Sequence, residues 1–335
     1  MKRILYIGNK LTNHGYTATN IETLGPLLAN EGIAVRYASS VKSKPLRLLD
    51  MIVKTLRHGF WSHYILIDTY STSNFWYAFA VSQLARMMRR KYIPILHGGE
   101  LPRRLERNPK LCRAIFGHAH INVAPSRYLE TAFSAAGFNV VHIPNTIETK
   151  NYTFQKRRQV APSLFWVRSF SPIYNPEMAL AVFAKLRTTY PEAALCMVGP
   201  DKEGHLEKVK RSAKNQGLPV QFTGRLSKSE WTKLSASFDV FINTTHFDNM
   251  PVSVIEAMAL GMPIVSTNVG GIPFLLEHEQ TALLVGDADT DAMVNAIKRL
   301  LSEPDLVARL TQNAAVVASG FDFEQVKHQW AEVLI

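Results

Sequence analysis

Residues 247–271 read FDNMPVSVIEAMALGMPIVSTNVGG, and this stretch decides how the rest of the chain is interpreted. It places Asp248 in a loop and Glu256 in an apolar helix that we predict to begin near Val252, followed by a buried strand and a glycine pair. Glu256 is the only charged residue that follows Asp248 within the stretch. A buried carboxylate needs a hydrogen-bonding partner, for which a polyol is suited. The N-terminal end of the helix suits a phosphate.

This stretch resembles the signature of retaining, nucleotide-sugar-dependent glycosyltransferases of family 4, also called group 1, which have the GT-B fold. In that family two acidic residues lie eight positions apart, and an Ala-Met-Ala turn, a Gly-x-Pro and a glycine pair follow them. Here Asp248 and Glu256 have that spacing, with Asp248 where most members have Glu. The resemblance implies that Glu256 binds the ribose of the donor and that Asp248 and the main chain near Met250 bind its sugar. The remaining donor contacts implied in this stretch are the helix-start amides at Val252 and the pair Gly270-Gly271.

Length and composition indicate an ordinary globular protein. The 335 residues are 47% hydrophobic, which is enough to bury a large core, and the length suggests two domains of about 150 residues each. The charge is uneven, because residues 1–160 carry 23 Lys and Arg against 8 Asp and Glu, and the rest of the chain carries 15 against 19. The basic half suits an anionic membrane, a phosphorylated acceptor or nucleic acid, and a solvated basic surface is the plain alternative.

Buried-looking strands alternate with helical patterns along the whole chain, which predicts an α/β protein with two parallel, doubly wound sheets. The first series of strands is expected at residues 4–8, 34–38, 64–68, 93–96, 121–124 and 140–143. The second is expected at residues 164–168, 195–198, 220–222, 240–243, 264–266 and 283–285. Two Rossmann-like domains with a central cleft between them follow from the resemblance. We place the acceptor-side domain at 1–150, a polar linker at 148–162 and the donor-binding domain at 151–320. The last helix, 321–335, is expected to return to the first domain.

Ligands bind beyond the carboxyl ends of parallel strands, so the loops there are the first candidates for function. His97 lies in such a loop, and the resemblance places it close to the transferred sugar and the acceptor. The loop after the first strand carries only Gly15, where the family has a glycine pair near the donor phosphates. The three arginines after the histidine loop are candidates to bind an anionic acceptor, since Arg matches phosphate geometry: Arg103, Arg104 and Arg107.

In the second half, Arg168 matches the family arginine that binds the donor diphosphate. The lysine that accompanies it in the family has no counterpart, because Tyr174 and Asn175 occupy that region. Arg225 is the first candidate to replace it. Gly199 matches the glycine turn near the nucleobase and ribose.

Two predicted helices combine basic and apolar residues, which is typical of helices that lie on anionic lipid. One carries the cations Lys42, Lys44, Arg47, Lys54 and Arg57 beside Leu46, Leu49, Ile52, Val53 and Leu56. The other, residues 75–90, ends in Arg86, Arg89 and Arg90, with Lys91 after it. An ordinary surface helix is an equally good interpretation of each.

No metal or other cofactor is expected. The two Asp-x-Asp triplets at 287–291 precede a predicted helix, where Asp caps the N-terminus. Cys112 and Cys196 belong to no CxxC or Cys/His cluster, so disulfides and zinc are not indicated. No motif for nucleic acid accompanies the basic residues. The first residues are too short an apolar run for a signal peptide, so a cytoplasmic protein, peripheral to the membrane at most, is expected.

Together with these observations, the resemblance implies a retaining, metal-independent hexosyltransferase. Its donor would be a UDP- or GDP-sugar, and its acceptor would be a glycan or lipid-linked hydroxyl in cell-surface polysaccharide synthesis. Arg168 and the helix-start amides would stabilise the leaving diphosphate. Two alternatives stay open at this point: a nucleotide-sugar epimerase, and a non-catalytic partner subunit of a transferase.

Overall fold

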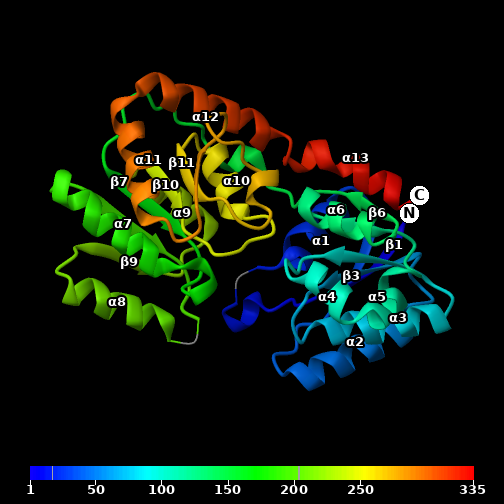
Figure 1. Ribbon diagram of the computed structural model, residues 1–335. Coiled ribbons are helices and arrows are strands. Elements are labelled where there is room, and N and C mark those ends of the chain that lie inside the picture. The colour runs from blue at the N-terminus through cyan, green and yellow to red at the C-terminus, as the bar shows by residue number, and fades with distance from the viewer. Residues whose placement is uncertain (17, 203) are drawn as a thin grey trace. The chain divides into compact units, whose positions relative to one another are not determined.

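The computed structural model describes residues 1–16, 18–202 and 204–335, which divide into two units. Unit 1 comprises Met1–Thr146 together with Phe323–Ile335, and unit 2 comprises Ile147–Asp322. Each unit is a parallel sheet covered by helices (Figure 1). The division falls within a few residues of the boundaries predicted at 150 and 320.

Unit 1 is built on a six-stranded parallel sheet with the order β2-β1-β3-β4-β5-β6. Its central strands are apolar on both faces, because helices cover both sides of the sheet. All six strands lie within two residues of the predicted positions, which confirms the first half of the expected fold. They are β1 Arg3–Ile7, β2 Ala34–Ala38, β3 Tyr64–Thr69, β4 Lys91–Leu96, β5 Asn122–Ala124 and β6 Val140–His142.

The helices of unit 1 follow the strands in alternation. The third of them ends at Met87 rather than at the predicted Arg90, because Arg89 has a positive φ of 53° that no α-helix accommodates. The helices are α1 Asn20–Asn30, α2 Lys44–His58, α3 Phe75–Met87, α4 Leu101–Arg107, α5 Pro109–Phe116, α6 Arg127–Ala135 and α13 Phe323–Val333, with a short 3-10 turn at Thr12–His14.

The last helix, α13, completes the core of unit 1. Its apolar face places Val326 and Trp330 against Tyr6 of β1 and Leu28 of α1, and all four side chains are buried. Trp330 is 2% exposed. The chain therefore begins and ends in the same unit, and Figure 1 shows both termini on unit 1.

Unit 2 repeats the architecture, with a six-stranded parallel sheet in the order β12-β11-β10-β7-β8-β9. Its strands again lie within two residues of the predicted ones. They are β7 Ser163–Val167, β8 Ala194–Val198, β9 Val220–Gly224, β10 Val240–Asn243, β11 Ile264–Thr267 and β12 Leu283–Val285. The helices are α7 Pro176–Thr189, α8 His205–Asn215, α9 Lys228–Ser235, α10 Val252–Ala259, α11 Thr290–Ser302 and α12 Pro304–Ser319.

The polar segment predicted as a linker is not loose, because its middle part packs on unit 2. Arg157 is 7% exposed, and its Nη1 donates to the carbonyls of Leu260 (3.0 Å) and Gly261 (2.9 Å) at the end of α10. Its Nε lies 3.6 Å from Asp239 Oδ1. Gly261 must be glycine, since its φ is +69° and a Cβ would come within 2.6 Å of the Gln155 carbonyl. The segment thus anchors the helix that carries Glu256.

No helix in the described ranges is long and apolar enough to cross a membrane.

Candidate functional site

The acidic loop of unit 2 holds a charge pair at the start of α10. Asp248 Oδ2 lies 3.1 Å from Arg168 Nη2, and both side chains are largely buried. Asp248 Oδ1 accepts a hydrogen bond from the Met250 amide at 3.1 Å. That amide is therefore occupied within the loop, whereas from the sequence we expected the main chain at Met250 to contact the sugar. Helix α10 begins at Val252, where the sequence predicts it.

The glycine pair after β11 packs against this loop, whereas from the sequence we expected it to contact the donor. A Cβ on Gly270 would come within 2.4 Å of the Asp248 carbonyl, and one on Gly271 would come within 1.8 Å of the Asn249 carbonyl. The Gly271 amide donates to the Asp248 carbonyl at 2.7 Å. Both glycines are therefore required for close packing of two backbones, which fixes the position of Asp248.

Arg168 follows β7 and is held from three sides. Its Nε donates to Asn243 Oδ1 at 3.3 Å, its guanidinium lies 5.2 Å from the centre of the Tyr174 ring, and Asp248 pairs with Nη2. The Nη2 contact is an ion pair that lacks hydrogen-bond alignment, and Nη2 is a buried donor without a hydrogen-bond acceptor.

Tyr174 stands where the family lysine is expected, and this half-buried residue adds a hydroxyl rather than a charge. Burial, followed by the Asp248 carboxylate, raises the pKa of Tyr174. Gly199, just after β8, packs against the backbone of Arg168. Its φ is +156°, and a Cβ would come within 1.7 Å of the Arg168 carbonyl. Glycine is thus required here, because the two backbones approach each other closely.

Glu256 is 4% exposed, and the structure supplies the partner that sequence reasoning sought in a polyol. Its Oε1 accepts from the Tyr152 hydroxyl at 2.7 Å and lies 2.9 Å from Lys228 Nζ. Burial, followed by the Glu256 charge, raises the pKa of Tyr152 far above its usual range, so Tyr152 remains a neutral donor. Lys228 itself is exposed at the start of α9.

Sequence reasoning missed these two partners. Tyr152 lies in the segment interpreted as linker, where nothing marks a tyrosine as a donor to a residue 104 positions away. Arg225, the expected replacement for the lysine, is exposed just after β9, and Lys228 at the start of α9 reaches the acidic helix. Ser253, in the first turn of α10, is also new: it is 9% exposed, and its hydroxyl is a buried atom without a hydrogen-bond partner.

In unit 1, His97 is held by an aspartate at the carboxyl end of β3. His97 Nε2 lies 3.0 Å from Asp68 Oδ1, which also accepts from the Tyr6 hydroxyl at 3.1 Å. Asp68 is 4% exposed, and its Oδ2 is a buried acceptor without a hydrogen-bond partner. Burial, followed by the charge of Asp68, raises the pKa of Tyr6 well above its usual value. The sequence signal was available, since Asp68 is a lone acid in an apolar strand.

The glycine signals of unit 1 have local explanations. A Cβ on Gly98 would come within 2.3 Å of the Ser71 amide nitrogen, so the loop after His97 needs glycine there. Gly15 ends the short 3-10 turn with a φ of +81° and has open space where a Cβ would be. Its backbone conformation, rather than a close neighbour, requires glycine.

The three arginines expected at an acceptor have different surroundings. Arg104 donates from Nε to the Ser71 carbonyl at 3.0 Å, and its guanidinium lies 4.3 Å from the centre of the Phe75 ring, so it holds α4 in place. Arg103 is exposed and pairs with Glu100 at 3.0 Å. Arg107 is exposed at the end of α4. Only Arg103 and Arg107 therefore remain as candidates for contact with an acceptor.

The Asp-x-Asp triplets have structural roles. Asp289 caps α11 by accepting from the Ala292 amide at 2.9 Å, as the sequence predicts. Asp287 lies 2.8 Å from His246 Nδ1, and Asp291 pairs with Lys185 at 2.7 Å. Among the described residues, no group of three His, Cys, Asp or Glu side chains is placed to hold a metal ion.

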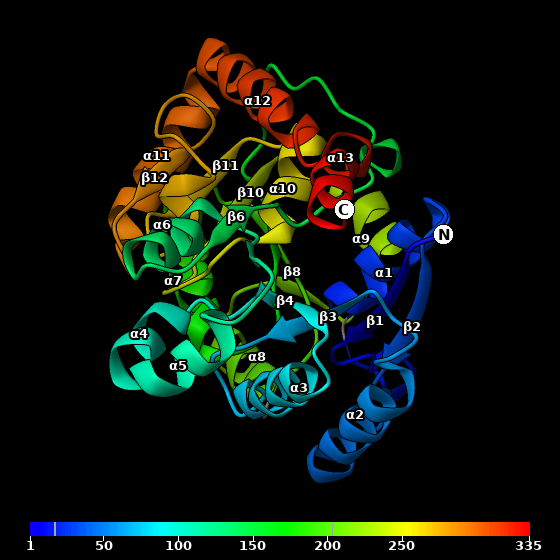
Figure 2. The same ribbon diagram turned by 90° about the vertical axis from the view of Figure 1, so that its right-hand side faces the viewer.

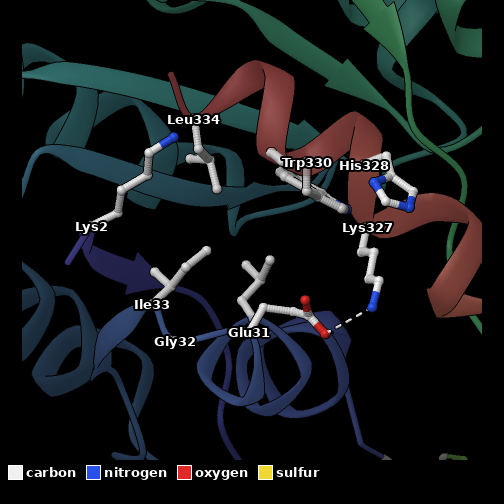
Figure 3. Close-up of a pocket in the computed structure, with 10 residues that line it drawn as sticks. Lys2, Glu31, Gly32, Ile33, Lys327, His328, Trp330 and Leu334 are labelled. Atoms are coloured by element: carbon white, nitrogen blue, oxygen red, sulfur yellow. Dashed lines mark hydrogen bonds and ion pairs between the residues drawn. The ribbon is translucent and has the colours of Figure 1, made fainter.

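A separate pocket of about 310 Å³ lies in unit 1 where α13 meets α1 (Figure 3). Lys327 reaches across it to Glu31 at 3.3 Å, and Lys2 and Ile33 line it just before β1 and β2 begin. The pocket is therefore at the amino edge of the sheet, away from Asp68 and the other carboxyl-end groups, and we assign it no ligand.

The comparisons with known proteins name the family to which this fold and these groups belong. The family model described as "Glycosyl transferases group 1" matches residues 150–317. The chain belongs to this glycosyltransferase family, as its acidic-helix motif predicted.

Relatives and solved structures agree with this assignment. An uncharacterized glycosyltransferase of Haemophilus influenzae is 26% identical over 201 residues, 58% of this chain and 55% of the relative. A GDP-mannose-dependent alpha-(1-6)-phosphatidylinositol monomannoside mannosyltransferase of Mycolicibacterium smegmatis is 24% identical over 220 residues, 59% of this chain and 57% of the relative. The chain thus matches a little over half the length of each of these two relatives.

Among solved structures, Anabaena HepE in complex with UDP and glucose superposes with a TM-score of 0.80 at 18% identity, over 100% of this chain and 99% of the other. Sucrose-phosphate synthase of Thermosynechococcus elongatus gives a TM-score of 0.82 at 18% identity, over 99% and 98%. These likenesses establish the GT-B fold.

Proposed function

We propose that the chain is a retaining hexosyltransferase that moves a sugar from a UDP- or GDP-sugar to a hydroxyl of a glycan or lipid-linked acceptor, without a metal. We place this reaction in cell-surface polysaccharide synthesis, at the cytoplasmic face of the membrane. The observation that carries the proposal is the Arg168–Asp248 pair at the start of α10, with Glu256 buried further along the same helix.

The diphosphate of the donor would bind at the N-terminal end of α10. Three groups there suit an anion: the guanidinium of Arg168, the first-turn amides at Val252 and the hydroxyl of Ser253, which is a buried donor without a partner. As the glycosidic bond breaks, negative charge develops on the leaving phosphate. Donors fixed in place beforehand stabilise that charge in the transition state, which is the main source of rate in such a site.

Glu256 would bind the ribose, whose hydroxyls donate to its carboxylate. The Tyr152 hydroxyl and the Lys228 ammonium hold this carboxylate in position before the donor arrives. Asp248 would bind hydroxyls of the sugar from its place beside Arg168. These roles give one carboxylate to the ribose and one to the sugar.

His97, in unit 1, would bind the acceptor hydroxyl. Because Nε2 lies 3.0 Å from Asp68 Oδ1, Nδ1 is the ring nitrogen that would be left for the ligand. Asp68 is thus a positioning residue for His97. The acceptor proton is proposed to pass to the leaving phosphate itself, which is the route that the family resemblance implies.

The donor nucleotide is tested first by titration calorimetry of UDP, GDP, ADP and CMP on wild type, Glu256→Gln and the control Glu230→Gln, which alters an exposed carboxylate. HepE has been crystallised with UDP and UDP-glucose, and one relative is named as GDP-mannose-dependent, so UDP and GDP come first. We expect one diphosphate to bind, and Glu256→Gln to weaken it about tenfold or more while the control does not.

Turnover is then measured as release of free nucleotide from the matching sugar donor. Release that rises with added acceptor supports transfer, and proton NMR of the product tests retention of the anomeric configuration. Rearrangement of the donor without an acceptor would mean an epimerase. Absence of binding by every nucleotide would instead favour a non-catalytic partner subunit.

A further inference from the structure

Helix α2 exposes an apolar stripe. Leu46, Leu49, Val53 and Leu56 are 58%, 56%, 50% and 52% exposed, and their spacing of three and four residues places them on one face of the helix. The opposite face is the buried one, where Met51 is 1% exposed. The helix therefore has an ordinary core face and, in addition, an outward apolar face that the fold leaves open. We call this set of four residues the α2 stripe.

The stripe continues past the end of the helix. Phe60 is 64% exposed, and Met87 at the end of α3 is 82% exposed. The two helix ends lie together, because a Cβ on Gly59 would come within 2.7 Å of the Met88 methyl carbon. Figures 1 and 2 show α2 at the outer side of unit 1, next to α3. The apolar surface is thus one helix long and runs along the outside of its unit.

Cations border this surface. The guanidinium of Arg90 lies 5.0 Å from the centre of the Phe60 ring, and Arg57, Arg86 and Arg89 are exposed near the helix ends. The single acid of α2, Asp50, is paired with Lys54 at 3.0 Å. Residues 1–146 as a whole carry 19 Lys and Arg against 7 Asp and Glu. A second copy of this surface would meet it with like charge, so the charge favours an anionic partner.

Arg47 is an exception among the cations that the sequence places on α2. It is 5% exposed, and it donates to Asn9 Oδ1 at 2.8 Å and to the carbonyls of Val41 and Lys42 at 2.7 and 2.6 Å. It fixes the start of α2 to the loop after β1. Arg47 therefore cannot reach a lipid headgroup.

We propose that α2 docks unit 1 on an anionic lipid bilayer. The α2 stripe and Phe60 enter the boundary between headgroups and acyl chains, and the cations beside them contact the headgroup phosphates. A straight apolar stripe along one helix with basic flanks is the pattern of a helix that lies in the membrane interface. The docking stands on unit 1 alone, and only its link to a lipid-borne acceptor rests on the proposed function.

The test is flotation of the whole chain with vesicles of phosphatidylcholine and phosphatidylglycerol, compared with vesicles of phosphatidylcholine alone. The stripe variant is Leu49→Ser with Val53→Ser, and the matched control is Val316→Ser with Val317→Ser, which removes exposed apolar side chains from α12 of unit 2. We expect the wild type and the control to float with the anionic vesicles, and the stripe variant to bind at least tenfold more weakly. All three should have the same unfolding temperature, because the changed residues are exposed.

A second readout follows insertion directly. A polarity-sensitive dye is attached at Leu49→Cys or, as control, at Val316→Cys, since Cys112 and Cys196 are fully buried. Anionic vesicles should raise the emission at position 49 and leave it unchanged at 316.

Three results would overturn the proposal: no binding of the wild type to anionic vesicles, equal binding of the stripe variant, or a dimer in sedimentation that the stripe variant abolishes. None of them depends on nucleotide binding, so a failed transferase assay leaves this test intact.

Discussion

The buried carboxylate of Glu256 shows at the scale of single residues why this site holds together. Removing a charge from water is costly unless hydrogen bonds or an opposite charge replace the water. Tyr152 and Lys228 provide one of each. The carboxylate is therefore already in position, so a ribose that binds there, as we propose, would require little reorganisation.

Tyr152→Phe removes the neutral donor to Glu256. Hydrogen bonds to charged groups contribute about 1.5–3 kcal/mol, so we expect a loss of that order in the free energy of unfolding. Nucleotide affinity should fall with it. Urea unfolding and calorimetry check both, with Tyr190→Phe as the matched change elsewhere in unit 2. An unchanged unfolding curve for Tyr152→Phe would contradict the role assigned to its hydroxyl.

Ser253→Ala separates binding from stability. Because the hydroxyl is a buried group without a partner, its removal should leave the nucleotide-free protein equally stable or stabilise it by about 1 kcal/mol. Affinity for the diphosphate should fall by about 1.5 kcal/mol or more, roughly tenfold, since a hydrogen bond to a charged phosphate is lost. The two measurements are thermal unfolding without ligand and calorimetric titration. Equal affinity of variant and wild type would exclude Ser253 from the phosphate site.

The two cysteines give a prediction about pH. Burial raises the pKa of Cys112 to about 11 and that of Cys196 to about 12, from an ordinary value of 9.0. The folded state therefore favours the neutral thiols, and their contribution to stability is complete below pH 9 and is lost as the pH rises toward 11 and 12. We expect neither thiol to react with a disulfide reagent at pH 8 until the protein is unfolded. Labelling of the native protein within minutes would contradict this.

At the scale of elements, α10 depends on a residue outside it. The C-terminal carbonyls of a helix lack partners within the helix. Here the buried guanidinium of Arg157 donates to two carbonyls at the end of α10. The segment before β7 therefore acts as a cap for the helix that carries Glu256. Sequence pattern alone suggested only a polar linker.

Arg157→Met should destabilise unit 2 by about 3 kcal/mol, because buried carbonyls and Asp239 lose their donor. Arg158→Met is the matched control, since Arg158 is adjacent and exposed. Differential scanning calorimetry measures both. Similar unfolding temperatures for the two variants would show that the cap contributes little.

At the scale of the whole molecule, the chain closes unit 1 with its last helix. Trp330→Ala should cost unit 1 about 3–5 kcal/mol, the range for a large buried aromatic side chain. The control is Trp76→Ala in the same unit, where the side chain is 50% exposed. In calorimetry only the unfolding temperature of unit 1 should fall. The transition of unit 2, which is the one that bound nucleotide should raise, should keep its temperature. Loss of both transitions together would mean that the two units unfold as one.

The sequence by itself determined the two parallel sheets and the family. Apolar strands that alternate with helices form such sheets wherever they occur, and the spacing of Asp248 and Glu256 is local and can be read along the chain. It also determined the N-terminus of α10 and the Asp289 cap, because both depend on neighbouring residues. Asp68 was within reach of the same reasoning, as a lone acid in an apolar strand.

Only the tertiary structure decided which residues support the site. Tyr152, Lys228 and Arg157 reach α10 from distant segments, and the packing of Gly271 on the Asn249 carbonyl joins two separate loops. The tertiary structure also decided which face of α2 is buried, because apolar residues are spread around that helix. Such contacts depend on where the folded backbone brings each segment, and no periodicity along the chain encodes that.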